Sequence, residues 1–204
     1  MPIAAVKLLA CALFGVVLAQ SWLPIWAGFA GAAVIVATAW RLRVRWQADP
    51  AAPDAAERAA LLSIAGTLVC LGYFLTMLLQ IGPELDVHTR LARKMANELW
   101  ILVAATAAVQ WIAQAPQATR DELDASIAAR ALSSACWVLL AQQAALVVWF
   151  GLGLEAGDPL RSIDMLVHLV IGSWMVAHVF HGLSCMRAYA SLRHEVSQDT
   201  GHAA

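Results

Sequence analysis

The sequence predicts an all-α integral membrane protein, and two observations carry this prediction. Of its 204 residues, 61% are hydrophobic and only 13% are charged, compared with a charged fraction of ~25% in soluble globular domains. The apolar residues also gather in six long runs almost free of charge, each close to the ~20 residues that an α-helix needs to cross a bilayer. The six predicted spans are residues 3–21, 22–40, 59–81, 95–115, 131–154 and 165–186.

Short polar segments join these spans, so we expect a six-helix bundle that is built as three helical hairpins. The predicted hairpins are residues 3–40, 58–115 and 119–192. The longest connection, residues 41–58, and the tail, residues 187–204, are each too short for a separate soluble domain, which takes ~50 residues or more. The whole chain, residues 1–204, is therefore predicted to be a single membrane domain.

The first two spans follow each other with an uncharged connection around Ser21 and Pro24, which is typical of a tight translocated turn. Lys7 and an apolar run that ends in Leu18 and Ala19 also resemble a cleavable signal peptide. A second span follows at once, and this favours an uncleaved first span.

The distribution of Lys and Arg predicts the orientation, because basic residues stay on the cytoplasmic side. The proposed hairpins place nine basic residues on the side of both termini and four on the other side. Both termini, the loop 41–58 and the tail 187–204 are therefore predicted to be cytoplasmic. The nine are Lys7, Arg41, Arg43, Arg45, Arg58, Arg120, Arg130, Arg187 and Arg193, and the four are Arg90, Arg93, Lys94 and Arg161.

An acidic motif precedes the fifth span. Asp121, Glu122 and Asp124 occupy the expected first turns of a helix, where the positive end of the helix dipole favours acids, and Arg130 follows at the entry to the apolar run. Thr119 and Glu122 have the spacing of a capping box. These residues form a candidate cytoplasmic interaction motif.

The stretch RDELDASIAARALSSACWVLL, residues 120–140, resembles an uncharacterised family of small bacterial inner-membrane proteins with an acidic "DERD"-type motif. Leu123 departs from the pattern, because the family often has arginine there. The similarity covers the last 85 residues and implies a multi-span protein of the bacterial inner membrane, with no activity attached. The residues at matching positions are Asp121, Glu122, Asp124, Ile127, Arg130 and Ala131.

The last span carries a candidate metal site. His178, His181 and Cys185 are spaced i, i+3 and i+4 to their neighbours, so they share one helix face, and imidazole and thiolate are ligands for soft or borderline metals. His168 and His181 also raise the possibility of haem, but no other span supplies a partner histidine. The simpler interpretation is that neutral histidines line a polar seam and hydrogen-bond to Gln142 or Gln143.

A second candidate site is polar and is predicted on the outer side. Glu98 lies one turn into the fourth span, and it is the acid that we expect to be most desolvated. Asp164 and His168 are i,i+4 neighbours, so the carboxylate could orient the imidazole or share a cation with it. The competing interpretation is that the loop charges here are simply solvated.

The sequence contains no P-loop, GxGxxG, HExxH or GxSxG motif, and no soluble catalytic domain. We therefore expect a non-enzymatic regulatory, sensory or accessory binding subunit without a cofactor, in contact with the lipid bilayer and with a membrane or cytoplasmic protein partner. A homo-oligomer fits the small residues on its spans, whereas the net charge of −1 disfavours nucleic acid. The alternatives are a small ion or metabolite transporter that uses Glu98, Asp164 and His168, and a metal- or haem-dependent redox protein that uses the histidines of the last span.

Overall fold

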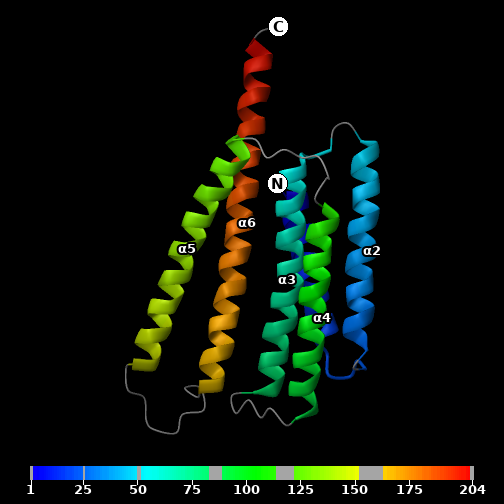
Figure 1. Ribbon diagram of the computed structural model, residues 1–204, viewed down its shortest axis with the longest axis vertical. Helices are drawn as coiled ribbons and strands as arrows, with labels where there is room; N and C mark the ends of the chain where they lie inside the picture. The colour runs from blue at the N-terminus through cyan, green and yellow to red at the C-terminus, as the bar shows by residue number, and fades with distance from the viewer. Residues whose placement is uncertain are drawn as a thin grey trace.

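The computed structural model describes residues 2–24, 26–49, 52–82, 89–113, 122–151 and 163–202, and every regular element in these ranges is a helix (Figure 1). Five of the helices are long and apolar enough to cross a membrane, whereas the apolar part of α1 is shorter. The helices are α1 (Pro2–Leu18), α2 (Ala27–Ala48), α3 (Ala55–Ile81), α4 (Arg90–Ala113), α5 (Glu122–Gly151) and α6 (Ile163–His202).

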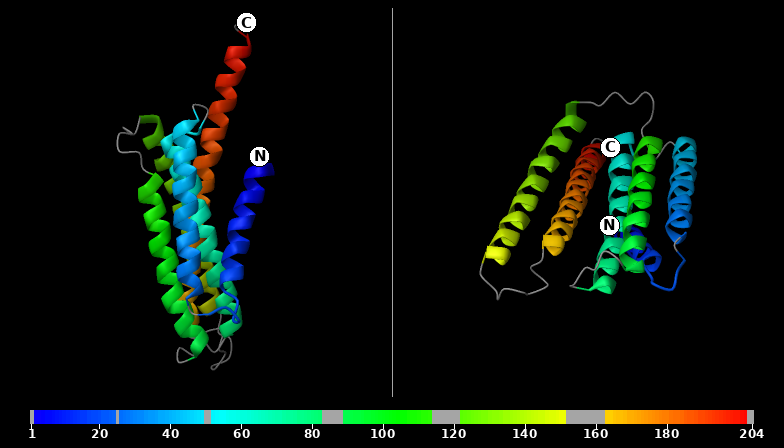
Figure 2. Two further views of the ribbon diagram at one scale, coloured as in Figure 1. Left: turned by 90° about the vertical axis from the view of Figure 1, so that its right-hand side faces the viewer. Right: turned by 60° about the horizontal axis from the view of Figure 1, so that its bottom comes forward.

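Helix α3 lies at the centre of the bundle. It packs extensively against α1, α4 and α6, while α2 lies against α4 and α5 lies against α6 (Figures 1 and 2). The expected pairing of consecutive helices holds for α3 with α4 and for α5 with α6. It is wrong for residues 3–40, because α1 barely touches α2 and packs on α3 instead.

Two glycines explain why α1 prefers α3. A Cβ atom at Gly15 would collide with the main-chain carbonyl of Val69, and a Cβ atom at Gly72 would collide with that of Ala12. Only glycine therefore allows the two backbones to come this close, as is common where helices pack in lipid. The small residues that fix this contact lie on non-consecutive helices, so the hairpin rule does not reveal it.

Side chains of α2 and α4 make hydrogen bonds with backbone groups at the end of the other helix. Trp26 occupies the N-cap position of α2 and makes no capping hydrogen bond with its side chain. The carboxylate of Glu98 on α4 instead accepts from the backbone N–H of Gly28. At the opposite end, the guanidinium of Arg43 on α2 donates to the main-chain carbonyl of Ile112, 3.0 Å away in the last turn of α4. A carboxylate and a cation thus lie at the helix ends that their charges favour.

The helices continue beyond the predicted spans into polar sequence. Residues 41–48 of the predicted cytoplasmic loop are the last turns of α2, and the predicted tail 187–204 continues α6 to His202. Figure 1 shows this end of α6 projecting past the other helices. Hydropathy marks where the hydrocarbon ends, whereas a helix satisfies its own backbone in water as well, so the two boundaries need not coincide.

Candidate functional site

A cluster of ionisable side chains is buried between α3, α4 and the connection from α1 to α2. Glu98 and Tyr73 are fully buried, and Lys94 is only 3% exposed. The Glu98 carboxylate accepts from the Tyr73 hydroxyl at 2.8 Å through Oε2 and from the Gly28 N–H at 3.1 Å through Oε1. Charged groups are costly at such positions, so each is expected to have compensating partners.

Lys94 supplies the positive charge of this cluster. Its Nζ donates to the main-chain carbonyls of Gln20 at 2.8 Å and Leu23 at 3.3 Å, and lies 4.0 Å from Glu98 Oε2. The side chain thereby ties the α1–α2 connection to α4. We call Tyr73, Lys94 and Glu98, with the backbone groups that they bind, the Lys94–Glu98 network.

Gly28 allows the carboxylate to reach the start of α2. A Cβ atom at this position would lie 2.7 Å from Glu98 Cγ and 2.8 Å from Glu98 Cβ, which is closer than real side chains approach. Any larger residue would push Glu98 away from the backbone N–H that it accepts from. The network therefore depends on a small residue of α2 as well as on its three polar side chains.

The expected acidic site is assembled only in part. Glu98 is the most deeply buried acid among the described residues, as predicted, but its partners are Tyr73 and Lys94, which the sequence did not single out. Asp164 is exposed, and it meets His168 through its main-chain carbonyl, 2.6 Å from Nδ1, rather than through its carboxylate. No contact joins Asp164 or His168 to Glu98 among the described residues.

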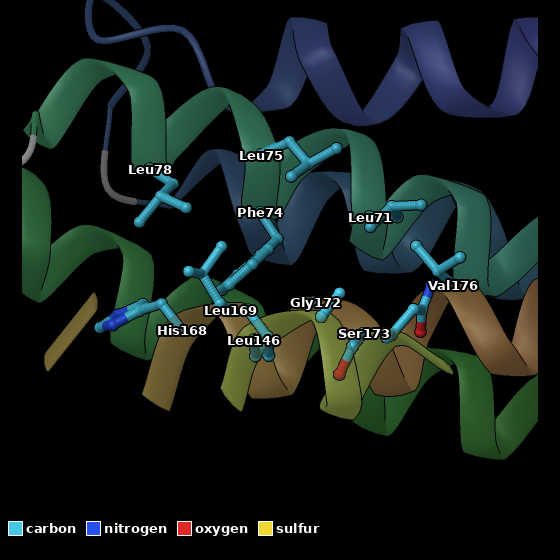
Figure 3. A pocket seen from close by; sticks show the side chains of 12 residues that line it. Leu71, Phe74, Leu75, Leu78, Leu146, His168, Leu169, Gly172, Ser173 and Val176 are labelled. Carbon is cyan, nitrogen blue, oxygen red and sulfur yellow. The ribbon is translucent and has the colours of Figure 1, made fainter. Parts of the chain in front are cut away.

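His168 instead lines an apolar groove between α3, α5 and α6. Its ring stacks on Phe74 of α3, with centroids 6.0 Å apart and planes inclined by 15°. The groove has a volume of about 300 Å³, and its lining, which is mostly apolar, includes leucine side chains from all three helices. Figure 3 shows His168 toward one end and Ser173 and Val176 toward the other. We call this feature the α3–α5–α6 groove.

One polar atom of the groove has no partner. Gln142 Oε1, on α5, is buried and meets no hydrogen-bond donor among the described residues. The adjacent Gln143 donates from Nε2 to the Ser173 hydroxyl at 2.6 Å, and that hydroxyl donates to the Val170 carbonyl at 2.7 Å. The expected hydrogen bonds between histidines and these glutamines are therefore not formed, and the acceptor of Gln142 stays available.

The candidate metal ligands on α6 do not form a metal centre. His178 Nε2 lies 2.8 Å from the Ser63 hydroxyl of α3, and its ring centroid is 6.4 Å from that of His181. Cys185 Sγ lies 3.9 Å from His181 Nε2, and His181 Nδ1 is buried without a partner in the described part of the chain. Across the described residues, no group of three or more His, Cys, Asp or Glu side chains could hold a metal ion.

The candidate cytoplasmic motif is described in part, because Asp121 lies outside the described residues. Glu122 is exposed at the start of α5, and Arg130 is exposed two turns further on. Asp124 accepts from the Tyr189 hydroxyl of α6 at 2.9 Å, so one acid of the motif fixes α5 against α6.

Comparison with known proteins returns no match among family models, curated proteins or solved structures. The resemblance of residues 120–140 to the DERD-type family stays a prediction. The network and the groove themselves are therefore the features that can indicate a function.

Proposed function

We propose that this chain is a non-enzymatic membrane protein that binds an apolar molecule from the lipid phase in the α3–α5–α6 groove. It would act as a sensory, regulatory or accessory subunit. The observation that carries the proposal is an apolar groove of about 300 Å³ with a buried, unpartnered acceptor, Gln142 Oε1, in its wall. Ligand sites are typically concave, mostly apolar and supplied with a few polar groups, and this volume lies at the lower end of their range.

The contrast with the Lys94–Glu98 network favours binding over ion transport. Both carboxylate oxygens of Glu98 accept hydrogen bonds, and the Lys94 ammonium faces two carbonyls and the carboxylate. Lys94 and Glu98 are thus engaged with partners inside the protein, which disfavours a role in ion exchange. The network is therefore best suited to holding α1, α2, α3 and α4 together.

The topology belongs to the same proposal. All six helices would cross a bacterial inner membrane, with both termini in the cytoplasm. Arg43 and Trp40, with the guanidinium carbon 5.7 Å from the ring centroid, and Arg58 and Trp46, at 5.8 Å, support a headgroup level at the end where α2 stops and α3 starts. In this orientation the exposed Glu122 at the start of α5 would lie on the cytoplasmic side.

A photo-crosslinking experiment tests the proposal. Diazirine-bearing octadecanol is titrated into the protein in nanodiscs, and the labelled peptides are mapped by mass spectrometry. We expect saturable labelling of the groove segments of α5 and α6. Labelling that only rises in proportion to the probe, without saturation, would contradict a binding site.

Two neighbouring alanines of α5 provide a matched pair of variants. Both alanines are exposed, but Ala145 lines the groove and Ala144 does not. Ala145→Phe should abolish the saturable labelling because the ring fills the groove, and Ala144→Phe should retain it. Equal labelling of the two variants would place the probe elsewhere on the protein.

A further inference from the structure

The polar atoms that line the α3–α5–α6 groove differ in what they can still accept or donate. The hydroxyl of Ser173 donates to the Val170 carbonyl, and it accepts from Nε2 of Gln143, a neighbouring residue that does not line the groove. Gln142 Oε1, by contrast, is an acceptor that has no donor among the described residues. A buried polar atom that lacks a partner destabilises the protein, so a ligand that donates to it recovers a large part of that free energy.

His168 adds a second acceptor to the lining of the groove. Its Nδ1 lies 2.6 Å from the main-chain carbonyl of Asp164. A carbonyl oxygen can only accept, so Nδ1 carries the proton of this hydrogen bond, and Nε2 of the neutral ring is left as an acceptor. The stacking of this ring on Phe74 holds it in the groove.

These two acceptors lie at different levels of the groove. Gln143, next to Gln142, contacts Ser173, and Ser173 is five residues beyond His168 on α6, which is about 7.5 Å of helical rise. Most of the other residues that line the groove are apolar, including Phe74 and Leu169 (Figure 3). A molecule that fits this wall has an apolar body and offers a proton from a hydroxyl.

We infer that the ligand of the groove is a lipid alcohol, a long apolar chain with a free hydroxyl that donates to Gln142 Oε1. This inference rests on the proposed function of the groove and names the ligand class. The same hydroxyl chemistry occurs in aliphatic and isoprenoid alcohols and in the reduced form of lipid quinones. An ester or a methyl ether of the same chain has no donor, and it leaves the acceptor of Gln142 unsatisfied.

Competition against the diazirine-bearing octadecanol in nanodiscs tests this inference. Two unlabelled competitors are compared, octadecanol and octadecyl methyl ether, which differ in whether the oxygen can donate. We expect octadecanol to compete about tenfold more effectively, which corresponds to about 1.4 kcal/mol, because only the alcohol donates a hydrogen bond to the unsatisfied acceptor. Equal competition by the two would overturn the inference and leave the proposed function intact. Without any saturable labelling, the proposed function itself falls.

Two glutamine variants assign the discrimination to one atom. Gln142→Met keeps the length of the side chain and removes the acceptor, so it should bring the ratio of alcohol to ether close to one while the groove still takes the chain. Gln143→Met is the matched control, because Gln143 directs its donor to Ser173 and does not line the groove. Retained discrimination in Gln142→Met, or its equal loss in both variants, would contradict the role of Gln142.

An alkyl hydroquinone, kept reduced and matched in chain length, distinguishes the sources of the hydroxyl. If it competes better than octadecanol and this advantage disappears in His168→Phe, the second acceptor is used and the ligand is a quinol. If octadecanol competes at least as well, the ligand is an aliphatic or isoprenoid alcohol. Both results support a donating ligand, whereas preference for the oxidised quinone would overturn it.

Discussion

The four helices α1–α4 and the hairpin of α5 and α6 handle polar groups in the membrane in opposite ways. In the first region, Glu98 and Lys94 are almost fully buried, and the protein supplies each with several partners. In the second, Gln142 Oε1 is buried at a groove and has no partner in the described part of the chain. The packing differs in the same direction, because 44% of the residues in the α3 span are buried and only 11% of those in the α5 span.

This difference separates a structural site from a binding site. A fully satisfied polar network in a low-dielectric environment holds its elements in one arrangement, whereas an unsatisfied atom is a place where another molecule can gain free energy. A buried charge alone would identify Glu98 as the candidate binding group. The presence of an unsatisfied hydrogen-bond acceptor identifies the groove instead.

The largest effect should come from the contact of α1 with α3. Gly72→Leu places a side chain against the Ala12 carbonyl, and because main chain cannot move aside as a side chain can, we expect no folded, monodisperse protein. Gly151→Leu on α5 is the control, since no atom lies within 4 Å of a Cβ there. Size-exclusion chromatography in detergent measures both. A monodisperse Gly72→Leu protein would mean that this contact does not hold the core.

The next largest effect should come from Lys94. Lys94→Met removes the cation that faces Glu98, and loss of one partner of a buried pair typically costs about 3–5 kcal/mol. Lys94→Met with Glu98→Gln should be less destabilised than the single variant, because no unpaired charge remains buried. Thermal unfolding in detergent compares them.

Arg187→Met on α6 serves as the control for the loss of a positive charge. Arg187 is exposed, so its replacement should change stability by no more than about 0.5 kcal/mol. A double variant less stable than Lys94→Met alone would show that Glu98 does not depend on Lys94 for its charge balance.

The smallest effect should come from removing a tyrosine hydroxyl, and this change can be made in both regions. Tyr73→Phe removes the hydroxyl that donates to Glu98 in the buried network and should cost about 1.5–3 kcal/mol. Tyr189→Phe removes the hydroxyl that donates to Asp124 at the partly exposed end of the hairpin, and it should cost less than about 1 kcal/mol. Thermal unfolding of the two variants measures the difference, and an equal cost would contradict the contrast between the regions.

Much of the fold follows from the sequence because apolar runs of the length of a bilayer leave few alternatives to helices. The described residues confirm the all-helical bundle, and five of the six predicted spans are helices long and apolar enough to cross a membrane. The association of α1 with α3 does not follow, because it depends on how Gly15 and Gly72 meet across two helices that are distant in sequence. A prediction that pairs consecutive helices cannot identify this contact.

The network and the groove were less accessible to sequence reasoning. Lys94 lies at the edge of an apolar run and therefore resembles a loop charge, although its ammonium binds carbonyls more than 70 residues away in sequence. Glu98 lies one turn further along the same face, and the i,i+4 spacing of opposite charges was the available signal. The polarity of Gln142 and His168 was recognised, but their partners depend on the angles between helices.

Tyr73 and Phe74 are consecutive residues of α3, and they serve different sites. The first donates to Glu98 in the network, and the second stacks on His168 in the groove, about 100° further around the same helix axis. A rigid rotation of α3 cannot move one ring without displacing the other. If a ligand rotates α3 when it enters the groove, thermodynamic linkage requires that it also change how favourable the hydrogen bond from Tyr73 to Glu98 is. Occupancy of the groove would then be transmitted to the network on the other side of the helix.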